Sequence, residues 1–181
     1  MHEFIGYVNK LKDIKRTGWV ERGVKNPESS AEHSFMAAVL SMLLAKNVDE
    51  KKVIKMALIH DLAESVVGDI ITKENWPSGG TVTEKEKMEK EEKAVKKMTS
   101  SLSAKTRKEV IALWEEYNQQ KTRESVFVRD IDIAERLIQA KIYHDRGNYK
   151  KPIEGFWKER NISMIKNKEI RTFVIKYIGG E

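Results

Sequence analysis

The chain contains no cysteine among its 181 residues, and it has only three prolines and four histidines. Without cysteine, the chain cannot form disulfides, thiolate zinc sites, iron–sulfur clusters or a cysteine nucleophile. Any bound metal must therefore be held by nitrogen and oxygen ligands. Because histidines and aspartates are few, whereas glutamates and lysines are abundant, only a small number of positions qualify for such a site.

Long hydrophobic runs are also absent. No apolar stretch approaches the roughly 20 residues that a membrane span requires. Residues 1–12 mix charged and apolar side chains, and they lack the hydrophobic core of a signal sequence. We therefore expect a soluble, cytoplasmic protein with no membrane partner.

The net charge of +6 comes from 34 basic and 28 acidic residues. A positive charge favours nucleic-acid binding, but lysine and glutamate alternate in stretches such as 83–97, which is typical of a solvated helix face. A modest positive field would equally attract a small phosphate-bearing substrate. The charge therefore does not choose between the two kinds of ligand.

Apolar residues recur at helical spacing along most of the chain. The expected helices cover about residues 2–14, 30–47, 50–66, 84–100, 104–119, 123–145, 153–161 and 167–178. No stretch alternates as a half-buried strand does over more than a few residues, and 124–128 is the one ambiguous segment. The sequence thus predicts an all-α fold.

Several residues mark where these helices begin and end. Ser29 and Glu32 have the spacing of a capping box, and Asp49 is suited to cap the next helix. Gly68 is expected to end that helix, because glycine tolerates left-handed backbone angles. Residues 69–82, which include Pro77, form a looser segment.

Four ionisable side chains lie on the inward faces of two neighbouring predicted helices. His33 shares an apolar stripe, and His60 and Asp61 follow apolar residues on their own helix, with Glu64 one turn further on. A single histidine on an apolar face is more often a hydrogen-bonded core residue, and the two carboxylates could pair with lysines. A buried aspartate is nevertheless unfavourable unless it is paired or bound to a cation. A divalent cation accounts for the whole set.

Short motifs surround these residues. They are Ser-x-Ala-Glu-His at 29–33, His-Asp-x-x-Glu at 60–64, Gly-Asp-Ile at 68–70, Val-Arg-x-x-Asp at 128–132 and Leu-Ile-Gln-Ala at 137–140. Together they resemble the HD-domain phosphohydrolases, an all-helical, metal-dependent family, and within it the 5'-deoxynucleotidase branch. The resemblance runs from the first helix to about Tyr143 and implies an HD-type helical bundle.

The resemblance implies that His33, His60, Asp61 and Asp132 hold a divalent transition metal. Helical periodicity by itself slightly favours Asp130, which lies within the apolar stripe of its helix, whereas Asp132 lies at the edge of the stripe. The family spacing favours Asp132. Ligation by two histidines and two carboxylates suits manganese, iron, cobalt, nickel or zinc.

The resemblance also implies catalytic roles for Glu64 and Asp69, with Asp69 in contact with the substrate. The segment expected to lie along the substrate continues through Ile70, Ile71 and Thr72.

An arginine before the second long helix is implied to orient the phosphate, and a nearby tryptophan to contact the nucleoside. Here these are Arg16 and Trp19. The two are adjacent in some bacterial relatives but are separated by two residues in this chain, which leaves Arg22 as an alternative phosphate ligand. Trp19 is equally suited to be an aromatic lid over the core.

We expect one domain over residues 1–181, because there is no internal repeat or low-complexity linker and 40% of the residues are apolar. Its metal core would cover roughly 29–145. Residues 153–178 would complete the core or form the surface of a homodimer, as relatives do. The apolar residues that suggest this are Phe156, Trp157, Ile162, Met164 and Ile165.

The expected function is removal of the 5'-phosphate from deoxyribonucleoside monophosphates, giving a deoxynucleoside and phosphate. One alternative is an HD-type phosphohydrolase that acts on triphosphates or cyclic phosphodiesters. The short chain, and the lack of a further lysine and arginine cluster around the metal motifs, count against it. A second alternative is a non-catalytic nucleotide- or nucleic-acid-binding protein, which only the net charge supports.

Overall fold

The computed structural model describes residues 1–74 and 79–180, so Pro77 of the expected loose segment lies outside the described residues. Within these residues the chain forms helices and loops, with isolated bridges but no strand. The all-α prediction is confirmed, and the ambiguous segment 124–128 is helical. None of the described helices has the length and apolar character needed to cross a membrane.

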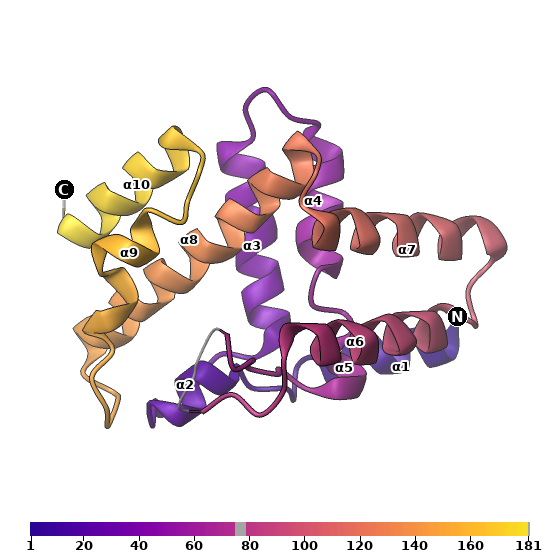
Figure 1. Ribbon diagram of the computed structural model, residues 1–181, viewed down its shortest axis with the longest axis horizontal. Helices are drawn as coiled ribbons and strands as arrows, with labels where there is room; N and C mark the ends of the chain where they lie inside the picture. The colour runs from indigo at the N-terminus through magenta and orange to yellow at the C-terminus, as the bar shows by residue number, and fades with distance from the viewer. Residues whose placement is uncertain (75–78, 181) are drawn as a thin grey trace.

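Figure 1 shows how the helices are arranged. In chain order they are α1 His2–Lys10, α2 Thr17–Glu21, α3 Ser30–Leu44, α4 Glu50–Ile59, α5 Glu64–Val67, α6 Glu84–Thr99, α7 Ala104–Gln119, α8 Arg123–Arg146, the 3-10 helix η1 Glu154–Trp157, α9 Glu159–Ile162 and α10 Lys168–Gly179. The long α8 crosses the molecule and packs against α3, α4, α7 and α10, while α1, α5 and α6 pack together at one side.

The predicted caps begin the two helices that follow the first loop. Ser29 accepts a hydrogen bond from the backbone N–H of Glu32, and the Glu32 carboxylate accepts one from the backbone N–H of Ser29. Asp49 accepts a hydrogen bond from the backbone N–H of Lys52 in the same way. Because these bonds satisfy the free N–H groups of the first turn, they define where α3 and α4 start.

The single helix expected over residues 50–66 was wrong. α4 ends at Ile59, and the chain turns through residues 60–63 before α5 begins at Glu64. In this turn Leu62, Glu64 and Ser65 donate backbone hydrogen bonds three residues back rather than four. The tighter winding redirects the chain, and Gly68, with a φ of 80°, ends α5 as predicted.

Two other segments also differ from expectation. The loop before Ser29 contains the short helix α2, which begins after Arg16. The helix expected over 153–161 is divided into η1 and α9 at Lys158, which has an extended backbone conformation. The apolar group in this region mainly caps the core: Ile165 is fully buried, and Phe156 and Ile162 pack against buried residues, although Met164 remains exposed.

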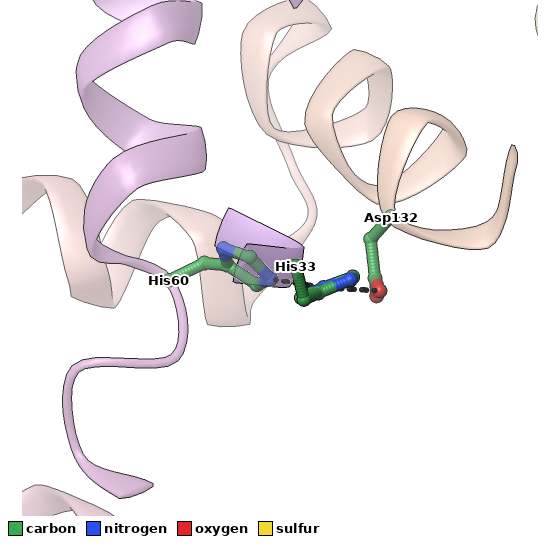
Figure 2. A group of neighbouring side chains, drawn as sticks. All are labelled: His33, His60 and Asp132. Atoms are coloured by element: carbon green, nitrogen blue, oxygen red, sulfur yellow. Dashed lines mark hydrogen bonds and ion pairs between the residues drawn. The ribbon is translucent and has the colours of Figure 1, made fainter. Parts of the chain in front are cut away.

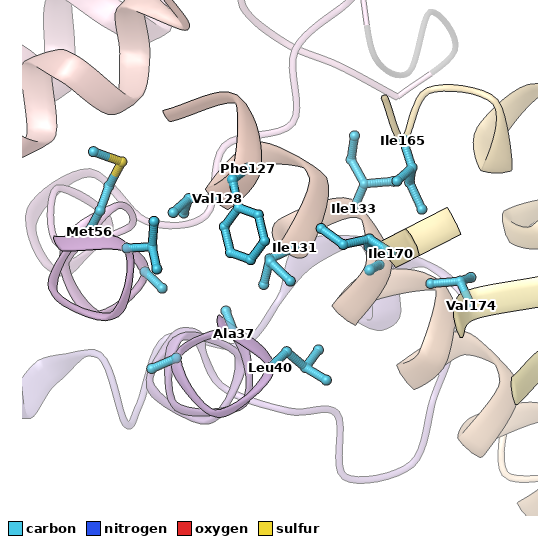
Figure 3. Close-up of a cluster of buried hydrophobic side chains, with 14 of the residues drawn as sticks. Ala37, Leu40, Met56, Phe127, Val128, Ile131, Ile133, Ile165, Ile170 and Val174 are labelled. Carbon is cyan, nitrogen blue, oxygen red and sulfur yellow. The ribbon is translucent and has the colours of Figure 1, made fainter. Parts of the chain in front are cut away.

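The main core lies where α3, α4, α8 and α10 meet (Figure 3). Its buried side chains include Ala37, Leu40, Met56, Phe127, Val128, Ile131, Ile165, Ile170 and Val174. Close packing of this kind resists small shifts, so it holds these helices in a defined relative position. Side chains at the edge of this core are therefore also held in place.

Asp130 connects α8 to the start of α10. Its carboxylate accepts hydrogen bonds from the backbone N–H groups of Lys166 at 3.0 Å and Asn167 at 2.7 Å. The Asn167 side chain in turn caps α10. The apolar-stripe position of Asp130 therefore reflects a structural contact between two elements of the core.

Asp130→Ala removes both of these charge-assisted hydrogen bonds and leaves two N–H groups without their acceptor. We expect the free energy of unfolding, measured by urea denaturation at pH 7, to fall by about 2 kcal/mol. Asp145→Ala is the matched control on the same helix, because its carboxylate is exposed and forms surface pairs with Lys141 and His144. Equal stability of the two variants would contradict the anchoring role of Asp130.

Candidate functional site

Four polar side chains converge beside the C-terminal end of α4. His33 comes from α3, Asp132 from α8, and His60 and Asp61 from the turn after α4. The Nε2 atom of His33 lies 3.2 Å from Nε2 of His60 and 3.4 Å from Oδ1 of Asp132 (Figure 2). Oδ2 of Asp61 lies 3.6 Å from the first of these nitrogens and 3.3 Å from the second.

These separations are those of ligands around one ion. Nitrogen and oxygen atoms at about 2.1 Å from a common transition metal are separated by about 3.0 to 3.4 Å. The two histidines and Asp132 are buried, so a cation bound here would be largely shielded from solvent. The donor set therefore fits a divalent metal ion.

The outer nitrogens of both imidazoles have acceptors. Nδ1 of His33 donates to the carboxylate of Glu135 at 2.6 Å, and Nδ1 of His60 donates to the carbonyl oxygen of Ala57 at 2.7 Å. In this tautomer both Nε2 atoms carry lone pairs. Two lone pairs facing each other at 3.2 Å repel unless a proton or a cation lies between them. This arrangement is the strongest local indication of a metal.

Asp132, rather than Asp130, lies beside the histidines. Its Oδ1 faces His33, while its Oδ2 accepts hydrogen bonds from the hydroxyl of Tyr117 and from Arg129, both at 3.1 Å. Burial alone would raise the pKa of Asp132, but His33, Arg129 and His60 outweigh it and hold that pKa well below its usual range. Asp130 instead binds the backbone before α10.

Arg16 connects the metal-binding group to two further carboxylates. Its Nη1 lies 3.0 Å from Oδ2 of Asp61, 3.6 Å from Oε1 of Glu64 and 3.7 Å from Oδ1 of Asp69. Burial alone would raise the pKa of Asp61, but His60, Arg16 and His33 outweigh it and hold that pKa well below its usual range. Asp61 is therefore ionised and available to a cation.

Glu64 is almost fully buried, and its Oε2 accepts a hydrogen bond from the hydroxyl of Ser30 at 2.5 Å. Burial raises the pKa of Glu64 well above its usual value, and the neighbouring charges of Asp61 and Asp69 raise it further. A buried carboxyl group with a raised pKa holds a proton more readily than an exposed one, which suits acid–base chemistry.

A cavity of about 260 Å³ opens beside these groups. Of the residues expected to contact a substrate, Arg16, Trp19, Asp69, Ile70 and Ile71 line it. Thr72 does not line the cavity, because its hydroxyl points to Glu84 and donates to that carboxylate at 2.6 Å. Arg22 does not line it either, and its guanidinium lies over the ring of Phe156.

Trp19 packs in the core and also lines the cavity. Its ring packs against Tyr143 and Phe156 in a small buried cluster, and its Nε1 donates to Glu28 at 2.8 Å. The ring also lines the cavity, although only a small part of its surface is accessible. The core contacts therefore hold the ring rigidly at the cavity wall.

Some residues of the site carry no obvious signal in the sequence. Glu135 was detectable only as a carboxylate one turn after Asp132 on the same helix face. Tyr117 comes from α7, and Ser30 is the first residue of α3, so neither belongs to a recognisable ligand pattern.

The expectation that no further basic cluster surrounds the site also needs correction. Besides Arg16, the cavity is lined by Lys87 of α6 and by Arg129 and Arg136 of α8. Lys87 is distant in sequence from the two arginines of α8, and only the tertiary structure brings them to one cavity.

Comparisons with known proteins agree with this architecture. A family model described as HD domain matches residues 8–170. The 5'-deoxynucleotidase HDDC2 of Dictyostelium discoideum is 40% identical over 150 residues, which cover 78% of this chain and 76% of the relative. The human protein of the same name is 39% identical over 144 residues, covering 79% and 68%. The crystal structure of the PH0347 protein from Pyrococcus horikoshii OT3 superposes with a TM-score of 0.77 at 32% identity, covering 99% and 97%.

Glu135→Ala removes the acceptor that orients the His33 ring. We expect the affinity for a divalent metal, measured by competition with a chelator, to fall about 10- to 100-fold. Glu135→Gln is the control, because its amide oxygen can still accept the proton of Nδ1, and it should retain most of the affinity. A Glu135→Ala protein that binds metal as tightly as the wild type would show that this contact does not support the site.

Proposed function

The chain belongs to the HD domain family, and on that basis we propose that it is a metal-dependent 5'-deoxynucleotidase. It hydrolyses deoxyribonucleoside 5'-monophosphates to a deoxynucleoside and inorganic phosphate. The supporting observation is the pair of Nε2 atoms 3.2 Å apart, flanked by Asp61 and Asp132, at the wall of a cavity large enough for a small ligand. Relatives named for this activity are 33–40% identical over most of the chain.

In this proposal His33, His60, Asp61 and Asp132 are the metal ligands. The bound ion would screen the charge of the phosphate and lower the pKa of water at the site. Two nitrogen and two oxygen donors suit manganese, iron, cobalt, nickel or zinc. Glu135 and Ala57 hold the two imidazoles in the tautomer that this ligation requires.

Glu64 is the proposed proton carrier. Its carboxyl lies one turn beyond Asp61, faces Arg16, and is held by Ser30 in a buried position. It accepts the proton that the attacking water loses and delivers it to the 5'-oxygen of the leaving deoxynucleoside. The transfer needs no other group, because the same carboxyl receives one proton and releases one in each turnover.

Arg16 is the proposed phosphate ligand. In the described part of the chain its ion pairs are all made through Nη1, so the other guanidinium nitrogens remain for phosphate oxygens.

The nucleoside would contact Trp19, Asp69, Ile70 and Ile71. A tight wall formed by Trp19 or Asp69 would exclude a 2'-hydroxyl and favour deoxyribose. Because such nucleotides are intracellular metabolites, we also propose a cytoplasmic location.

Metal analysis of the purified protein, followed by phosphate release from ribo- and deoxyribonucleoside monophosphates with different metals, tests this function. Asp61→Ala should lose both metal and activity. Glu64→Ala should retain metal but lose turnover about 100-fold or more. Full activity in Glu64→Ala would contradict the proton-transfer role. Salt-dependent nucleic-acid binding without any phosphate release would instead favour a non-catalytic protein.

We further propose a homodimer that forms through the outer face of α3. Phe35, Met42 and Leu43 are each at least half exposed on this helix, and they lie on one side of it at spacings of seven and eight residues. A second copy would cover this apolar stripe. Light scattering should give a dimer mass for the wild type and a monomer mass for Leu43→Glu, with the helical content unchanged. A monomeric wild type would contradict the proposal.

A further inference from the structure

Arg136 is the cation on the cavity wall that has no balancing partner. The three other basic side chains that line the cavity are each paired: Arg16 with Asp61 at 3.0 Å, Arg129 with Asp132 at 3.1 Å and Lys87 with Glu91 at 3.6 Å. Within residues 1–74 and 79–180, Arg136 makes no hydrogen bond or ion pair. An arginine that is largely buried in protein is rarely left in this state unless a ligand pairs with it.

The position of Arg136 on α8 directs it toward the metal-binding group. It follows Asp132 by four residues, so the two lie on the same face of the helix. Helical side chains lean toward the N-terminus, which brings the guanidinium back over the turn that carries Asp132. Both residues line the cavity, and no ion pair joins them among the described residues, so the guanidinium is not already held by this carboxylate.

The charges around Arg136 favour an anion at this point. Burial lowers its pKa despite the nearby charge of Asp132, and the positive charges of Arg129 and Arg16 lower it further. Two guanidinium groups, Arg16 and Arg136, thus repel each other across a cavity that both of them line. An anion bound between them would remove this repulsion and pair with both.

We propose that Arg136 binds the phosphoryl group of the nucleotide, and afterwards the inorganic phosphate product, in the cavity that it lines together with Arg16. Its planar guanidinium can donate two parallel hydrogen bonds to phosphate oxygens. It is thus a second phosphate-binding arginine beside Arg16. The identity of the nucleotide rests on the proposed function, whereas the binding of phosphate does not.

Titration calorimetry with inorganic phosphate tests this proposal on the metal-loaded protein. Arg136→Met removes the charge and retains an unbranched apolar side chain. We expect its dissociation constant for phosphate to rise about 10-fold or more, with wild-type metal content and thermal unfolding. Arg146→Met is the matched control, because Arg146 is exposed near the end of the same helix, and it should bind phosphate as the wild type does.

Phosphate binding that is equal in Arg136→Met and wild type would overturn the proposal. If Arg136→Met failed to fold, Arg136→Lys would replace it, and it should weaken phosphate binding because an ammonium cannot form the two parallel bonds. A larger loss for deoxynucleoside diphosphates than for inorganic phosphate would also overturn it, since Arg136 would then contact a different phosphate.

The same proteins separate this proposal from the proposed function. If the wild type released no phosphate from any deoxynucleotide, yet bound phosphate through Arg136, the function would be wrong and the role of Arg136 would stand. If the wild type were an active deoxynucleotidase and Arg136→Met bound phosphate normally, the proposed function would stand and the role of Arg136 would be wrong.

Discussion

The structure depends on one close contact, the approach of two imidazole nitrogens to 3.2 Å inside the protein, which is favourable only when a proton or a cation lies between them. His33 is completely buried, and the outer nitrogen of each ring is committed to an acceptor, so the lone pairs of the inner nitrogens face each other. Two carboxylates at 3.3 to 3.6 Å concentrate negative charge at the same point. A divalent cation converts this repulsion into attraction, which is why the same arrangement that is costly when empty is selective for a metal.

The rest of the fold holds the contributing helices so that this contact persists. The capping box at Ser29 starts α3 one turn before His33, and it thereby determines the position of the His33 ring along the helix axis. The tight turn after Ile59 directs His60 and Asp61 to the same point. On α8, Asp130 and Asp132 are separated by about 200° around the helix axis, so one binds the chain before α10 while the other faces the histidines. One face of α8 thus carries a structural contact, through Asp130, and the opposite face carries a residue of the metal-binding group, Asp132.

Charge is also balanced across the cavity beside the metal-binding group. Arg16 lies among three carboxylates, and Arg129 holds the outer oxygen of Asp132. These pairs help to hold the pKa values of Asp61 and Asp132 below their usual range in a buried site, whereas burial raises the pKa of Glu64. Arg136 remains as the positive charge that an incoming phosphate can neutralise. The cavity thus has basic side chains on its wall beside the metal-binding group.

The sequence by itself determined the all-α fold, the caps at Ser29 and Asp49, and a set of ligand candidates in which only Asp130 and Asp132 competed. Helical periodicity shows which face of a helix is buried, and a scarce histidine or aspartate on such a face is conspicuous. Periodicity does not show what that face meets. Glu135 contacts His33 across 102 positions of the chain, and Tyr117, Lys87 and Arg136 reach the cavity from helices whose relative positions are not encoded locally. The break after Ile59 and the position of Thr72 outside the cavity were likewise decided only by tertiary structure. Asp132 was already favoured by the family spacing, and only the packing of α3 against α8 places it beside His33.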